Sequence, residues 1–121
     1  MHPFDDAPNQ FEFLLEVAGF RHNSQIPVEQ VSDGDSVRYI AEPDNEWDPK
    51  AIRLEVGGNT LGYVPRGYLS LLHRRWENGA RVEGEVFRVN GTARRPLVYV
   101  LTRIGNGGRA SGSNSHYAVA S

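Results

Sequence analysis

The chain of 121 residues contains no cysteine and only one lysine, Lys50. Without cysteine it can have no disulfide framework, no thiolate nucleophile and no cysteine-based metal site. No apolar run approaches the roughly 18 residues needed to span a membrane. The segment Met1–Asp6 also lacks the features of a signal peptide. We therefore expect a cytoplasmic protein without membrane association, large enough for a single hydrophobic core.

The charged residues are unevenly distributed, although the net charge is only -2. The first 20 residues hold four acidic and no basic side chains, whereas residues 86–121 hold five arginines and no acidic side chain. A local basic stripe can contact phosphate whatever the net charge. Arginine's planar fork suits phosphate and stacks on bases. This distribution is compatible with nucleic-acid binding but does not require it.

Short apolar runs separated by polar turns predict a small β protein. Alternating hydrophobicity predicts strands that begin near Phe11, Val37, Ala51, Thr60, Ala80 and Pro96. Leu69, Leu72 and Trp76 share one face of a predicted helix. We expect a mainly β fold with one or two short helices, a small β-barrel of OB or SH3-like type, over residues 11–104. Residues 1–10 are expected to be a flexible lead, and the glycine- and serine-rich residues 105–121 a disordered tail.

A polar, turn-prone loop between two of these strands carries the candidate site. From Glu42 to Leu54 the sequence reads EPDNEWDPKAIRL. Asp48 followed by proline is typical of a cap on one helical turn, which needs no ligand. Trp47 lies between two carboxylates. It is either a lid that folds back over the end of the barrel or an exposed platform that stacks on a base.

This loop, with the run GYVP that begins at Gly62, resembles the core signature of the HIRAN domain family. The resemblance extends from about Phe13 to Ile104 and includes the strand that ends in VAGFR at Arg21. It implies a non-catalytic module that recognises the 3′-hydroxyl end of single-stranded DNA. It also implies a role in DNA repair, replication-fork processing or defence.

The resemblance assigns roles to individual residues of the loop. Asp48 would accept a hydrogen bond from the terminal hydroxyl, and Trp47 would stack on the terminal base. Asn45 and Arg21 would hold the last phosphates. A carboxylate near a phosphodiester is repulsive unless the nucleic acid offers a donor, and a free hydroxyl is such a donor. A 3′-phosphate would instead face Asp48 as a like charge.

The sequence departs from the family pattern at His22, where DNA-binding members carry an aromatic residue. Histidine can stack or bind phosphate with less area, or it is an ordinary surface residue here. Tyr63 lies in the neighbouring strand and either lines the site or packs beside the loop. We expect Phe87 and Tyr99 to lie in the core. The lysines of the family are absent. Arg66, Arg74 and Arg75 either replace them or, as we favour, form a solvated helix face.

Catalysis, cofactors and metal ions are not expected. The four histidines are scattered without a metal-ligand spacing such as HExxH, and the serines lack a base partner. We expect a monomer, whose helicase or nuclease partner would act in trans. One alternative is a small barrel that binds protein as an adaptor for a DNA-processing enzyme, in which case Trp47 would be buried. Another is binding to RNA or to internal single strands, which needs no free end.

Overall fold

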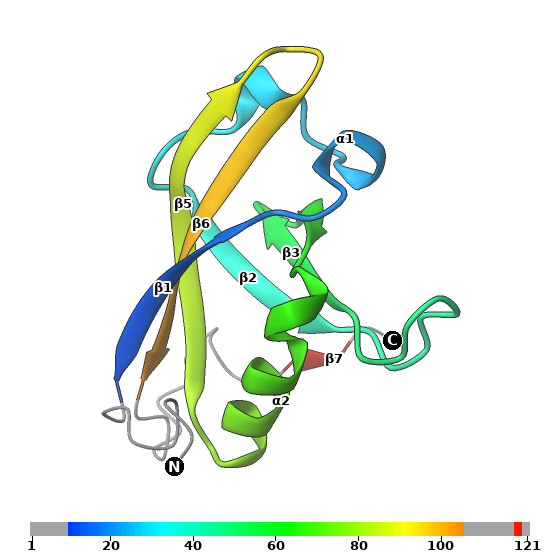
Figure 1. The fold of residues 1–121 in the computed structure, drawn as a ribbon, viewed down its shortest axis with the longest axis vertical. Helices are drawn as coiled ribbons and strands as arrows, with labels where there is room; N and C mark the ends of the chain where they lie inside the picture. Colours follow the sequence, from blue (N-terminus) through cyan, green and yellow to red (C-terminus); the bar gives the residue numbers. More distant parts are fainter. Residues whose placement is uncertain (1–9, 106–117, 120–121) are drawn as a thin grey trace.

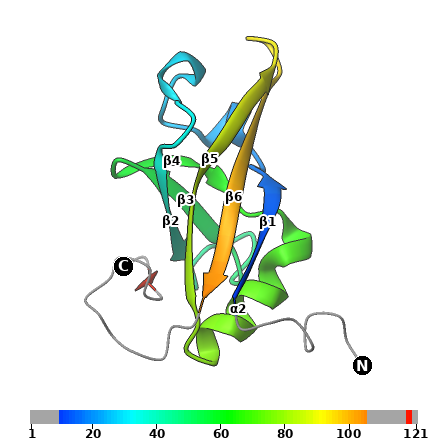
Figure 2. The ribbon, with the colours of Figure 1, turned by 90° about the vertical axis from the view of Figure 1, so that its left-hand side faces the viewer.

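The computed structural model describes residues 10–105 and 118–119, which form one mainly β unit. In chain order its elements are β1 (Phe11–Glu16), α1 (Phe20–Asn23), η1 (Val28–Gln30), β2 (Ser36–Ala41), β3 (Ile52–Val56), β4 (Asn59–Tyr63), η2 (Arg66–Tyr68), α2 (Leu69–Glu77), β5 (Arg81–Gly91), β6 (Pro96–Gly105) and β7 (Ala118–Val119). The long β5–β6 hairpin runs along the length of the molecule (Figure 1, Figure 2). The mainly β class with short helices is confirmed.

The strands form one open sheet and not the closed barrel that the sequence suggested. Six strands pair antiparallel in the order β1-β6-β5-β2-β3-β4, and β7 pairs in parallel with β2. Within the described residues the edges of the sheet meet at one bridge, where Ala18 and Tyr63 exchange hydrogen bonds of 2.8 and 2.9 Å. β1 has already ended at Glu16, and Gly19, with a left-handed φ of 68°, turns the chain into α1. Because of this early turn, the chain after β1 pairs with β4 at one residue only, and the barrel is not closed.

The hydrophobic core lies on the inner face of this sheet and is covered by α2. Leu69, Leu72 and Trp76, the predicted helix face, are all buried. After Asn78, Gly79 takes a positive φ of 87°, which ends the helix as its sequence predicts. None of the helices within residues 10–105 is long and apolar enough to cross a lipid bilayer.

Phe87 is not a core residue, contrary to our expectation, because its side chain is 45% exposed. The pairing of β5 with β6 shifts register between Val86 and Arg88, so that Phe87 is the extra residue of a β-bulge. Val86 faces the core, and Phe87 follows it on the outer face. Tyr99 is half-buried, pairs with Arg88 and shares this outer side.

The two predicted terminal segments fall mostly outside the described residues. Residues 1–9, 106–117 and 120–121 are not described, so the flexible lead and the disordered tail stay predictions. Within the expected tail, Ala118 and Val119 form β7 and pair with Ile40 and Ala41 of β2. β7 therefore lies beside the strand end from which the β2–β3 loop departs (Figure 1).

Candidate functional site

An open groove of about 660 Å³ lies where the β2–β3 loop, α1, β4 and η2 meet. The structure brings four of the six predicted site residues to this groove: Asn45, Trp47, Asp48 and Tyr63. The other two, Arg21 and His22, are exposed on α1. Their neighbour Asn23 lines the groove in their place. The β2–β3 loop and α1 lie on the same side of the fold (Figure 1).

Two consecutive turns hold the β2–β3 loop in shape. At its base, the backbone N–H of Glu42 donates to the carbonyl of Ala51 at 2.9 Å. The first turn is closed by Asn45 N–H to the carbonyl of Glu42 at 3.0 Å, and the second by Ala51 N–H to the carbonyl of Asp48 at 3.0 Å. Prolines fix the backbone inside each turn, at positions 43 and 49. The backbone of the loop is therefore ordered by its own hydrogen bonds and prolines.

Asn45 is the internal support of the loop. Its Oδ1 accepts hydrogen bonds from the backbone N–H groups of Trp47 at 2.8 Å and Asp48 at 3.0 Å. Its Nδ2 donates to Glu42 Oε1 at 2.9 Å. Both ends of the Asn45 amide are thus engaged within the protein. Contact of Asn45 with DNA stays a prediction. The structure shows that this side chain also stabilises the conformation of the loop.

Trp47 is exposed, so the alternative in which it folds back as a lid over the end of the barrel is wrong. Its residue surface is 87% exposed, far more than that of Leu14 or Phe87, the other exposed large apolar residues in the described part of the chain. Exposure of an indole to water is unfavourable by the hydrophobic effect. The two hydrogen bonds that Asn45 makes to the loop backbone hold Trp47 in this exposed position. The ring is therefore available as a flat apolar surface at the edge of the groove.

Asp48 both caps the second turn and retains an oxygen for other contacts. Its Oδ1 accepts the backbone N–H of Lys50 at 2.9 Å, which confirms the predicted capping role. The structure records no hydrogen bond to Oδ2 from any residue that it describes. Asp48 can therefore cap the turn through Oδ1 and accept a hydrogen bond from a ligand through Oδ2.

Below the loop, Glu42 accepts hydrogen bonds from three side chains on three different segments. Oε1 accepts from Asn45 and from the Tyr63 hydroxyl, each at 2.9 Å, and Oε2 accepts from Arg53 Nη1 at 2.5 Å. Partial burial alone would raise the pKa of the Glu42 carboxyl. The hydrogen bonds from Asn45, Tyr63 and Arg53 outweigh burial and lower the pKa below its usual value. Burial and the bond to Glu42 raise the pKa of the Tyr63 hydroxyl.

Sequence reasoning missed Glu42, Arg53 and Asn23 as parts of the site. The pairing of β3 with β4 places Arg53 directly opposite Tyr63, on strands that the sequence predicted. Two polar side chains side by side at the foot of a loop indicate a partner between them. Strand register would therefore have pointed to Glu42. Asn23 had no such signal because the four-residue helix α1 was not predicted.

The residues in and around the groove carry charges of both signs. The loop contributes the carboxylates of Glu46 and Asp48, with exposed Asp44 beside them. The segment η2 contributes Arg66, and Arg21 is exposed on α1, the helix whose Asn23 lines the groove. The described residues contain no group of three or more histidine, aspartate or glutamate side chains placed to hold a metal ion. The groove therefore offers an apolar ring, an acceptor and separated cations.

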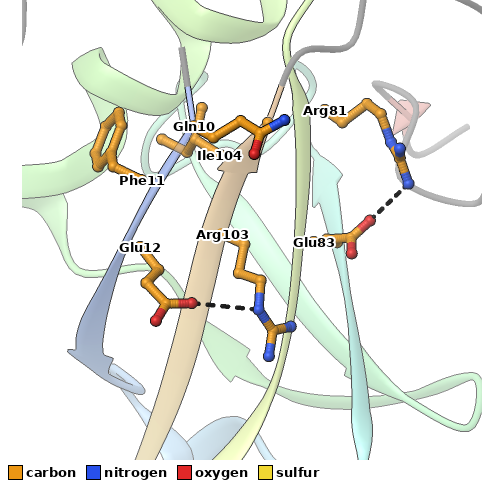
Figure 3. Close-up of a pocket in the computed structure, with 8 residues that line it drawn as sticks. Gln10, Phe11, Glu12, Arg81, Glu83, Arg103 and Ile104 are labelled. Carbon is orange, nitrogen blue, oxygen red and sulfur yellow. Dashed lines mark hydrogen bonds and ion pairs between the residues drawn. The ribbon is translucent and has the colours of Figure 1, made fainter. Parts of the chain in front are cut away.

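A second cavity, of about 440 Å³, lies between β1, β5 and β6 and is less suited to a charged ligand (Figure 3). Its charged side chains pair with one another. Arg81 contacts Glu83 at 2.9 Å, and Arg103 contacts Glu12 at 3.3 Å. These pairs, one within β5 and one between β6 and β1, balance the local charge, so we place the functional site at the groove with Trp47.

Comparison with known proteins identifies relatives of this chain. A family model described as the HIRAN domain matches residues 10–100. The crystal structure of the HIRAN domain of human HLTF is similar at a TM-score of 0.58 and 22% identity, covering 86% of this chain and 84% of that one. A crystal structure of a protein from Lactobacillus plantarum is similar at a TM-score of 0.58 and 20% sequence identity, covering 78% of this chain and 96% of that one.

The NMR structure of the HLTF HIRAN domain is also similar, at a TM-score of 0.54 and 21% identity, with 81% of this chain and 80% of that chain covered. At such identities the likeness of these structures supports a shared fold and not a shared ligand. The comparison with curated proteins yields no significant match.

Proposed function

Because the chain belongs to the HIRAN domain family, we propose that it is a non-catalytic nucleic-acid-binding module that recognises the 3′-hydroxyl end of single-stranded DNA. One observation carries the proposal. The most exposed large apolar side chain in the described residues, Trp47, directly precedes a carboxylate that keeps one oxygen available, Asp48. Stacking on a base and acceptance of a hydroxyl proton are the two interactions that a strand end requires.

In this proposal the acidic residues of the groove select the chemistry of the strand end. Asp48 Oδ2 accepts a hydrogen bond from the terminal hydroxyl while Trp47 stacks on the last base. A terminal phosphate meets the carboxylates of Glu46 and Asp48, both of which line the groove, and is repelled. The same carboxylates disfavour an internal phosphodiester at this position, so that a free end is preferred.

The basic residues in and around the groove then hold the rest of the strand. Arg66 of η2 lines the groove, and Arg21 and His22 are exposed on α1. Arginine side chains reach phosphates through charge-assisted hydrogen bonds. Phosphates one or two nucleotides from the end would lie over these cations. His22 adds a second, smaller ring on which a base can stack.

The wider role follows from the same proposal. A module without catalysis works beside an enzyme that acts on DNA ends, such as a helicase or a nuclease supplied in trans. We place this work in the cytoplasm and in DNA repair, replication-fork processing or defence. The protein is proposed to bind as a monomer, because one groove contains all the contacts described.

Fluorescence anisotropy on a labelled oligonucleotide of about ten nucleotides tests the proposal. The same sequence is prepared with a 3′-hydroxyl and with a 3′-phosphate, at low and moderate salt, and circular single-stranded DNA serves as competitor. We expect tight binding only of the 3′-hydroxyl form and weak competition by the circle. Equal binding of both ends, or full competition by the circle, would contradict end recognition. Absence of binding would favour the protein-binding adaptor.

A further inference from the structure

The two residues proposed to read the strand end, Trp47 and Asp48, are held by Asn45. Asn45 is held in turn by Glu42, which does not line the groove. The backbone N–H groups of Trp47 and Asp48 both donate to Asn45 Oδ1, at 2.8 and 3.0 Å. Asn45 Nδ2 in turn donates to Glu42 Oε1 at 2.9 Å. This chain of contacts leads from the exposed indole down to one carboxylate.

Glu42 is itself fixed by the two strands beneath the loop. Tyr63 of β4 donates its hydroxyl proton to Oε1 at 2.9 Å, and Arg53 of β3 donates to Oε2 at 2.5 Å. The Glu42 side chain is only 13% exposed, so water competes little for these bonds. Hydrogen bonds to an ionised carboxylate are stronger than those between neutral groups. The orientation of the Asn45 amide is therefore set by the sheet.

We propose that Glu42 is the positioning residue of the strand-end site. It touches no DNA, and it sets the preference for a 3′-hydroxyl over a 3′-phosphate by holding Asn45. The inference rests on the proposed function and adds the residue on which its selectivity depends. Without Glu42, the Asn45 amide can rotate, and the two N–H groups that it holds lose their common acceptor. Trp47 and Asp48 then move independently of each other.

The chain supplies a matched control in Glu55. Glu55 also pairs with Arg53, at 2.9 Å, and its side chain is 12% exposed, nearly the same as that of Glu42. The structure records no hydrogen bond to Glu55 from Asn45 or Tyr63. Loss of an ion pair with Arg53 is thus common to both positions, whereas contact with the loop belongs to Glu42 alone.

The experiment compares Glu42→Ala, Glu42→Gln and Glu55→Gln in a Trp76→Phe background, where Trp47 is the sole tryptophan. Two quantities are measured: the ratio of affinities for 3′-hydroxyl and 3′-phosphate oligonucleotides, and the steady-state anisotropy of Trp47 without DNA. We expect Glu42→Ala to lower the ratio about tenfold and to lower the anisotropy. Glu42→Gln, which keeps an oxygen acceptor for Asn45 and Tyr63, should restore most of both. Glu55→Gln should change neither.

A folded Glu42→Ala protein with unchanged ratio and anisotropy would overturn the proposal, and so would equal effects of Glu55→Gln. If Glu42→Ala fails to fold, Asn45→Ala breaks the same chain one step nearer the surface and should give the same two losses. A parent protein that binds both ends equally would refute the proposed function. The anisotropy of Trp47 would still decide whether Glu42 positions the loop.

Discussion

The hydroxyl of Tyr63 donates a hydrogen bond to the carboxylate of Glu42 at 2.9 Å, across 21 residues of sequence. Tyr63 was predicted as a DNA-binding residue, and it does line the groove. Its hydroxyl, however, is committed to the first residue of the β2–β3 loop. A ligand could therefore contact the Tyr63 ring or donate to its oxygen, while the hydroxyl proton ties the loop to β4.

Replacing Trp47 by alanine should weaken DNA binding without loss of stability. Stacking of one base on an aromatic ring contributes about 1–3 kcal/mol, so the affinity should fall between about 5-fold and 150-fold. An 87% exposed side chain contributes little to the core, and the midpoint of urea unfolding should stay the same. Anisotropy titrations with the 3′-hydroxyl oligonucleotide give the affinity. A large drop in the unfolding midpoint would instead show that the indole packs on the fold.

Replacing Asp48 by asparagine should reduce discrimination between strand ends, to the part that Glu46 supplies, while the turn survives. The asparagine oxygen can still accept the Lys50 N–H that Asp48 Oδ1 accepts now. The negative charge that repels a 3′-phosphate is lost. We expect the affinities for the two oligonucleotide ends to approach each other, at unchanged thermal stability. Asp44→Asn, which removes an exposed carboxylate just outside the groove, is the control and should keep the discrimination.

Glu42 should make the stability of the protein dependent on acid pH. Its pKa in the folded protein lies below the ordinary value of 4.5, so the ionised form stabilises the fold at neutral pH. This contribution begins to disappear below about pH 4.5 and is lost as the pH falls through the folded pKa. Urea unfolding of the parent and of Glu42→Gln should differ by about 1 kcal/mol at pH 7. The difference should shrink on acidification, and a constant difference would contradict the assignment.

The buried pair of Tyr39 and Thr102 should show strong coupling in unfolding experiments. Their hydroxyl oxygens lie 2.7 Å apart, and Thr102 is completely buried. Thr102→Val leaves the Tyr39 hydroxyl without its partner and should cost about 1–3 kcal/mol. Tyr39→Phe in the same protein should recover part of this loss, because no polar group is then left unpaired. Strictly additive effects in the double-mutant cycle would contradict the coupling.

The regular strands and α2 could be predicted because their signals are local. The alternation from Ile52 to Val56 and the spacing of Leu69, Leu72 and Trp76 follow directly from the periods of strand and helix. Closure of the sheet could not be predicted in this way. It depends on how far β1 continues beside β4, and Gly19 ends that approach after a single bridge.

The site was partly predictable for the same reason. Trp47 and Asp48 stand out in a polar loop, and the resemblance to a family assigned them roles. The support beneath them was not visible, since Glu42, Arg53 and Tyr63 come together only when the register of β3 and β4 is known. The prediction for Phe87 failed because Val82 and Val86 face the core, so that alternation along β5 places Phe87 on the outer face.

The bridge between Ala18 and Tyr63 can form only because the neighbouring Gly62 has no Cβ atom. A Cβ added to Gly62 would lie 2.4 Å from Val17 Cγ1 and 2.8 Å from the Ala18 carbonyl oxygen. Any other residue at position 62 would therefore push apart the segment that carries α1 and the strand that supports the loop. Because glycine has no side chain, Gly62 lets these two segments lie in direct contact. Gly62 does not line the groove, yet it decides how closely the two segments that border the groove can approach each other.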